Sequence, residues 1–198
     1  MQTLKVGLVL SLCLLTGAVR AESTGTCDKP FEASLPSGST LALDLRAGDI
    51  DIVGVDRTTV VVLCDARNIE DTRQIRVAFE PSGGSAKLRV SGGYNDHARI
   101  RIEVPRKTHL SVRCTAGRLD IRGIRGDKDV RLLAGDLRID MGDPSEYAEI
   151  QTSVNAGDLH LNPFGTHKGG LLRSFHRTQK DGSYSLRAYL WAGNVTLR

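Results

Sequence analysis

The chain of 198 residues carries 27 Lys and Arg against 23 Asp and Glu, so its formal net charge is only +4. A nucleic-acid-binding protein would show clustered positive charge, and this composition does not favour one. The length suffices for one domain.

The first 21 residues have the layout of a secretory signal peptide. Lys5 supplies a positive start, residues 6–15 form an apolar run, and Val19-Arg20-Ala21 ends on the small-x-small pattern of a cleavage site. The apolar run is shorter than the roughly 20 residues that a transmembrane helix needs. We predict cleavage after Ala21 and export to the periplasm or the cell surface and exterior. An uncleaved anchor and a buried helix are the alternatives. No later run is long enough to span a membrane.

Three cysteines follow the predicted signal peptide: Cys27, Cys64 and Cys114. Export permits disulfides, and an odd number leaves at least one cysteine without a partner in the chain. Cys114 occupies an inward strand position, which indicates a buried free thiol. We predict that Cys27, in an N-terminal leader over residues 22–30, pairs with Cys64. A bond between Cys64 and Cys114, or no bond, is the alternative.

One short motif, Ala-Gly-polar-aliphatic-x-aliphatic, occurs five times. Glycine permits a positive φ at a bend, and Asp or Asn beside it suits a turn. The aliphatic tail alternates with period two, as do the residues before each Ala-Gly, so each copy predicts strand, turn, strand. The predicted turn residues are Gly48, Asp49, Gly117, Gly135, Asp136, Gly157, Asp158, Gly193 and Asn194.

The spacing of the repeats predicts a stack. Successive motif glycines lie 69, 18, 22 and 36 residues apart, and spacings near 20 fit single coils that bury their apolar side chains against each other. We therefore predict an all-β, single-domain β-solenoid over residues 31–198, a parallel β-helix-like stack of short strands. The handedness of the stack and the path of residues 53–107 stay open.

Metal binding is the alternative interpretation of the turn acids and the histidines. Asp49, Asp136 and Asp158 could align as a column of calcium ligands, but Arg118 places a positive charge in that column. We interpret each acid as a cap of its own turn. The five histidines form no closely spaced pair, although His167 and His176 could share a site. We expect no metal and no cofactor.

A candidate binding face comes from outward strand positions. If the coils stack in register, Arg113, Arg131, Tyr189 and Trp191 point away from the core on one side. Aromatic rings supply contact area and arginine supplies charge and hydrogen bonds, which suits sugars or anionic polymers. The alternative is an ordinary solvated face on which Trp191 covers the end of the core.

The Ala-Gly-Asp repeats, the strand Ile-Arg-Ile-Glu-Val-Pro over residues 100–105 and the closing Ala-Gly-Asn-Val over residues 192–195 resemble the bacterial putative-adhesin domain family of unknown function. The resemblance covers roughly residues 31–198 and implies a β-helix-like fold in an envelope protein. It implies no catalytic residues. This sequence departs from the family pattern at Arg118, where Asp is more usual.

The sequence contains neither a Gly-x-Ser-x-Gly elbow nor a phosphate-binding glycine loop. We predict a non-catalytic exported envelope or surface protein, an adhesin-like binding module. The expected partner is a polysaccharide, another cell-surface polymer or an envelope protein. The alternatives are a structural or assembly protein of the periplasm and, less favoured, a β-helix lyase or hydrolase that cleaves polysaccharides.

Overall fold

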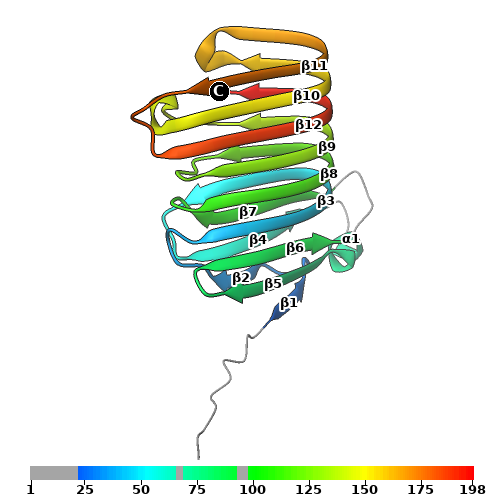
Figure 1. The fold of residues 1–198 in the computed structure, drawn as a ribbon. Helices are drawn as coiled ribbons and strands as arrows, with labels where there is room; N and C mark the ends of the chain where they lie inside the picture. Colours follow the sequence, from blue (N-terminus) through cyan, green and yellow to red (C-terminus); the bar gives the residue numbers. More distant parts are fainter. Residues whose placement is uncertain (1–21, 66–68, 93–97) are drawn as a thin grey trace, which may run out of the picture.

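The computed structural model describes residues 22–65, 69–92 and 98–198 (Figure 1). The predicted signal peptide and His97 lie outside the described residues. The elements in chain order are β1 (Ser23–Thr26), β2 (Phe31–Ser34), β3 (Thr40–Val55), β4 (Thr59–Asp65), α1 (Ile69–Gln74), β5 (Arg76–Ser82), β6 (Ser85–Ser91), β7 (Arg99–Pro105), β8 (His109–Arg122), β9 (Lys128–Ile139), η1 (Pro144–Glu146), β10 (Tyr147–Leu161), η2 (Asn162–Phe164), β11 (Thr166–Thr178) and β12 (Tyr184–Leu197).

The prediction of an all-β fold is confirmed. All twelve described strands belong to one sheet, and the sheet does not close on itself. Its long strands follow the order β3-β8-β9-β12-β10-β11, in which all neighbours are parallel except the antiparallel pair β10 and β11. Strand β12 therefore lies between β9 and β10, although it follows β11 in the chain.

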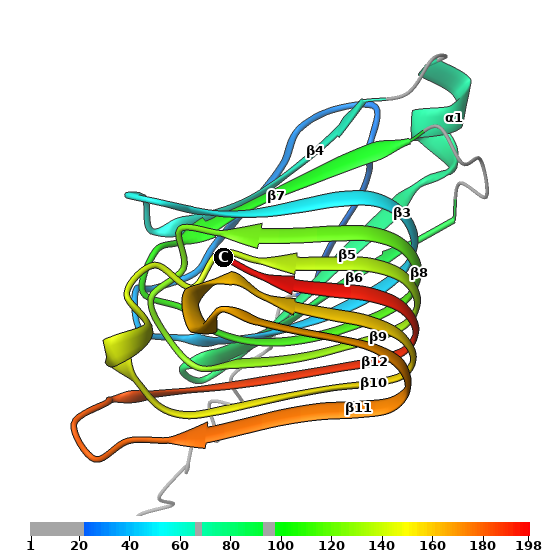
Figure 2. The ribbon, with the colours of Figure 1, turned by 90° about the horizontal axis from the view of Figure 1, so that it is seen from above.

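Strands β3, β8, β9, β10 and β12 each bend at their motif glycine, and the two arms on either side of the bend face each other (Figure 2). The sequence predicts two short strands separated by a turn at this point. The structure instead has one continuous strand of 12 to 16 residues in β3, β8, β9, β10 and β12. The aliphatic side chains of both arms point between them and form the core.

The motif glycines lie side by side in neighbouring strands, with Gly117 paired to Gly48 and to Gly135. Gly135 has a φ of 124°, which a residue with a Cβ rarely adopts. A Cβ at Gly135 would also lie 1.9 Å from the carbonyl oxygen of Gly117, and one at Gly157 would lie 1.7 Å from that of Gly193. Glycine is therefore required twice over, by the bend and by the close approach of the next strand.

The segment whose path the sequence leaves open builds the β3 end of the stack. Strand β6 pairs with the first arm of β3, and β7 pairs with the second arm, both in parallel. Strands β5 and β4 then add antiparallel to β6 and β7, and β2 adds to β4. Within the predicted leader, Ser23–Thr26 forms β1, which pairs antiparallel with β5.

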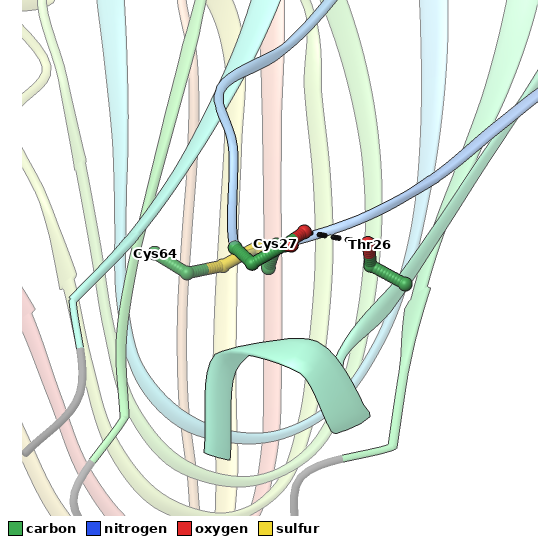
Figure 3. The surroundings of a disulfide bond; sticks show 4 residues. Thr26, Cys27 and Cys64 are labelled. Atoms are coloured by element: carbon green, nitrogen blue, oxygen red, sulfur yellow. Dashed lines mark hydrogen bonds between the residues drawn. A yellow bond between two sulfur atoms is a disulfide. The ribbon is translucent and has the colours of Figure 1, made fainter. Parts of the chain in front are cut away.

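A disulfide joins Cys27, directly after β1, to Cys64 near the end of β4 (Figure 3). The two Cα atoms are 5.5 Å apart, and Cys27 is buried. The backbone N–H of Cys27 also donates to the carbonyl of Ile75. Cys114 is free and buried, and burial raises the pKa of its thiol to about 11, so the thiol stays protonated at neutral pH.

We expect Gly135→Ala to lower the free energy of unfolding by more than about 4 kcal/mol, because it combines a strained φ with a clash against backbone. Gly142→Ala is the matched control, since Gly142 has a φ of 69° but open space around its Cα. The control should lose only about 1–3 kcal/mol from backbone strain. Urea unfolding measures both, and equal losses would contradict the role of the close approach.

We expect Cys27→Ser/Cys64→Ser to lower the free energy of unfolding by about 2–4 kcal/mol, because the bond closes a loop over a sequence separation of 37 residues. Reductant should destabilise the native protein by a similar amount and leave the double variant unchanged. Free thiols at all of Cys27, Cys64 and Cys114, measured by mass spectrometry, would show that the bond does not form.

Candidate functional site

The predicted binding residues lie on one exposed surface, the solvent side of the first arms of β8, β9, β12 and β10, which we call the outer face. Arg113 pairs in register with Arg131, and Arg131 pairs with Tyr189. These three side chains thus form a row across adjacent strands. Trp191 follows two residues after Tyr189 and is 54% exposed.

Two open hollows indent the outer face. One, of about 360 Å³, lies between Arg131, Ser153 and Tyr189. The other, of about 430 Å³, lies around His109, Asp127 and Ser185. Asp129 and Arg187 line both hollows. Together the hollows form a shallow trough that crosses the strands.

The charges along the trough are only partly neutralised. Arg187 donates to Glu149 at 3.0 Å, and this hydrogen bond is the main reason that the pKa of Glu149 is lowered. Arg131 lies 3.5 Å from Asp129. Arg113 lies beside the trough, in register with Arg131. It has no carboxylate of the described residues within 4.0 Å, so its guanidinium is available to an anionic ligand.

His109, Asp127 and Ser185 form a polar cluster in the trough. The Nδ1 atom of His109 lies 3.0 Å from Asp127, and Ser185 donates to the same carboxylate from its backbone N–H at 2.7 Å and from its hydroxyl at 3.0 Å. Burial raises the pKa of Asp127, but the bonds from Ser185 and the charge of His109 outweigh it and leave the pKa lowered. The carboxylate separates the serine from the histidine, whereas a hydrolase triad places the histidine between them.

Beneath this cluster Lys128 is buried in the core, in register with Leu110 and Leu186. Its ammonium donates to the carbonyls of Ile124 and Gly126 and to the hydroxyl of Tyr147. Burial lowers the pKa of Lys128 to about 8. The sequence analysis overlooked this residue, although the period-two pattern of its strand already places it inward.

An apolar patch borders the trough at the bend. Leu133, Trp191 and Leu172 are exposed by 53%, 54% and 78%, and each lies just beside the bend of its strand. Asn155 holds the equivalent position in β10 and donates to the hydroxyl of Tyr189 at 2.9 Å. The sequence analysis named only Trp191 from this set. The place directly before Ala-Gly, shared by Leu133, Asn155 and Trp191, was the available signal.

The turn acids lie together along the far side of the bend and contact neighbouring strands. Asp136 accepts a hydrogen bond from Asn194 at 2.9 Å. Asp49 lies 3.7 Å from Arg99 and 3.9 Å from Arg118. Arg118 is paired in register with both Asp49 and Asp136, so its positive charge separates two carboxylates that would otherwise be adjacent.

The sequence analysis did not predict one pair of histidines that lie close together in the structure. His160 and His167 face each other across β10 and β11, with their Nδ1 atoms 2.9 Å apart. They are seven residues apart in the chain, and only the antiparallel pairing brings them together. His176 lies elsewhere on β11, 3.5 Å from Glu149. Among the described residues no group of three or more His, Cys, Asp or Glu side chains is placed to hold a metal ion.

No model of a known protein family matches the sequence, and no curated protein matches it. Two solved structures are similar to the structure of this chain. A putative cell adhesion protein from Clostridium sporogenes superposes with a TM-score of 0.54 at 12% identity, over 85% of this chain and 98% of the other. A putative adhesin from Bacteroides fragilis gives a TM-score of 0.34 at 9% identity, over 86% and 96%. The first likeness shows a shared fold.

In the described part of the chain no helix has the length and apolarity to cross a membrane.

We expect Lys128 to contribute about 2 kcal/mol of added stability between pH 7 and pH 9.5, because its pKa is depressed from 10.5 to about 8 in the folded state. Over that range the unfolded chain binds more protons at this site than the folded chain, so this contribution rises with pH. The raised pKa of Cys114 acts in the opposite direction, equally in the native protein and in a Lys128 variant. Lys128→Met should remove this contribution, so that the change in stability between the two pH values is about 2 kcal/mol more favourable in the native protein than in the variant. Urea unfolding at the two pH values measures it, and an equal change in both proteins would contradict the assignment to Lys128.

Proposed function

We propose that the protein is an exported, non-catalytic, adhesin-like module that binds an extended polysaccharide along the outer face. The row of Arg113, Arg131 and Tyr189 beside the exposed Trp191 carries this proposal. The disulfide between Cys27 and Cys64 supports export, since such bonds persist in oxidising compartments. The shared fold with a putative cell adhesion protein supports the adhesin-like role.

The trough suits a polymer that runs across the strands. Neighbouring strands lie about 4.8 Å apart, so such a polymer meets one side chain from each strand in turn. Tyr189 and Trp191 offer rings for the apolar faces of sugars, and Arg113 and Arg131 offer donors for hydroxyl or carboxylate groups. A shallow trough open to solvent admits a chain without requiring its end.

The register of the repeats supports a β-solenoid fold, which is part of the same proposal. The motif glycines of β3, β8, β9, β12 and β10 lie in one row, and the bent strands stack in parallel over a shared core. This arrangement supports a β-solenoid whose coils remain open on the side opposite the bend. The same repeats support membership of the putative-adhesin domain family.

A second candidate function is cleavage of polysaccharides. The cluster of His109, Asp127 and Ser185 is the candidate catalytic group for it, but the geometry of this cluster argues against catalysis. In this cluster the serine hydroxyl donates to a carboxylate of lowered pKa, so neither group is prepared to act as a general acid at neutral pH. A binding role without turnover therefore fits the trough better.

We expect the protein to bind at least one member of a polysaccharide array, with acidic chains such as polygalacturonate bound more tightly than neutral dextran. Tyr189→Ala/Trp191→Ala should weaken binding by about tenfold or more, since exposed aromatics dominate such contacts. Arg113→Ala/Arg131→Ala should weaken binding of the acidic chains more than binding of the neutral chains. Affinity electrophoresis and calorimetry measure these effects.

Arg76→Ala is the control for these variants, because it removes an exposed positive charge from β5, away from the outer face. It should bind as the native protein does. Absence of binding across the array, or binding that survives both double variants, would refute the role of the outer face. Newly formed reducing ends or unsaturated products during incubation would refute the non-catalytic assignment.

A further inference from the structure

Strand β11 forms one edge of the sheet and pairs only with β10 among the described strands. It runs over Thr166–Thr178 and lies at the end of the stack that is remote from β1 (Figure 1). Nearly all its side chains are exposed, in contrast to the alternating burial of β10. Such an edge presents unpaired backbone N–H and carbonyl groups that another strand can bind.

The second arm of β11 carries a definite pattern on the face that continues the core. Arg173, Phe175 and Arg177 pair in register with the buried Val154, Thr152 and Ile150 of β10. They therefore point the same way, two residues apart from each other. The guanidinium of Arg177 lies over the ring of Phe164, 5.0 Å from its centre, and Phe164 stacks on Phe175 at 5.1 Å.

The positive charges of β11 have no acidic partner. The strand contains Lys168, Arg173 and Arg177 and no Asp or Glu. No carboxylate of the described residues lies within 4.0 Å of these three cations. Lys168 instead donates to the carbonyl of Ser174, and Arg173 donates to that of Gly169, so both cations bind backbone of their own strand.

Charges on an edge strand commonly serve to prevent aggregation, and here they oppose pairing with a second copy. Two β11 strands placed side by side would bring arginines of both copies together, which is unfavourable. The same charges favour an acidic strand. Arg173, Phe175 and Arg177 place a cation, an aromatic ring and a second cation at alternate positions. A partner strand is complementary if it carries an acidic, an apolar and a second acidic residue at alternate positions.

We propose that the second arm of β11 docks an extended acidic segment of a partner protein as an additional strand of the sheet. The backbone of the segment pairs with the free edge, its two acidic side chains meet Arg173 and Arg177, and the apolar side chain between them covers Phe175. Main-chain bonds supply affinity in this mode of recognition, and the alternate side chains supply specificity. Arg173, Phe175 and Arg177 point to the side of the sheet opposite to the outer face.

The test uses the full chain purified after export and the fluorescent peptide Thr-Glu-Thr-Val-Thr-Glu-Thr. Fluorescence anisotropy should show saturable binding that weakens with salt. Arg173→Glu/Arg177→Glu should abolish binding of this peptide and create binding of the peptide with Lys in place of Glu. Lys29→Glu/Arg76→Glu, which changes the net charge equally near β1, should bind as the native protein does.

Two methylated peptides separate strand pairing from simple charge attraction. Backbone N-methyl groups on the two odd-numbered inner positions block one edge of the peptide strand, and those on the three even-numbered positions block the other. One of the two peptides should lose binding by roughly tenfold or more while the other retains it. Binding of both methylated peptides would overturn the proposal. It would also be overturned if the native protein did not bind the plain peptide and the Arg173→Glu/Arg177→Glu variant did not bind the Lys peptide. Dimerisation of the native protein that Arg173→Glu/Arg177→Glu abolishes would assign the edge to a second copy instead.

Discussion

The close approach of each motif glycine to the carbonyl of its neighbour governs the architecture. Because a Cβ on Gly135 would lie 1.9 Å from the carbonyl oxygen of Gly117, the two strands can align in one register only. A shift by one residue would place a side chain against that carbonyl and would turn the aliphatic residues outward. The same row of glycines thus fixes the bend, the register and the content of the core.

The outer face inherits its order from that register. Arg113, Arg131 and Tyr189 are distant in sequence, yet they align because their strands reach the bend after the same number of residues. The trough needs no specialised loop, since its floor is the sheet itself. The open edge at β11 is different. Its basic side chains occupy the positions at which β10 carries Val154 and Ile150, so the apolar core ends at β11.

The sequence was sufficient for features that depend on a repeated local pattern. The all-β class followed from alternating aliphatic residues, and the alignment of Gly48, Gly117 and Gly135 followed from identical spacing around Ala-Gly. Features that depend on which strands become neighbours in the sheet could not be predicted from the sequence. The pairing of His160 with His167 and the insertion of β12 follow from which strands become neighbours. The burial of Lys128 depends on three acceptors that loops and Tyr147 bring to one point.

The position of β12 has a consequence for how the chain reaches its native state. Strands β9, β10 and β11 are synthesised before β12, but β9 and β10 acquire their shared neighbour only when β12 arrives between them. Growth of the sheet in the order of synthesis is therefore impossible at this place. The edges of β9 and β10 therefore remain unpaired until β12 is in place. Contacts between residues far apart in the sequence form slowly, which delays this pairing. Until the gap is filled, both edges stay open to pairing with foreign strands.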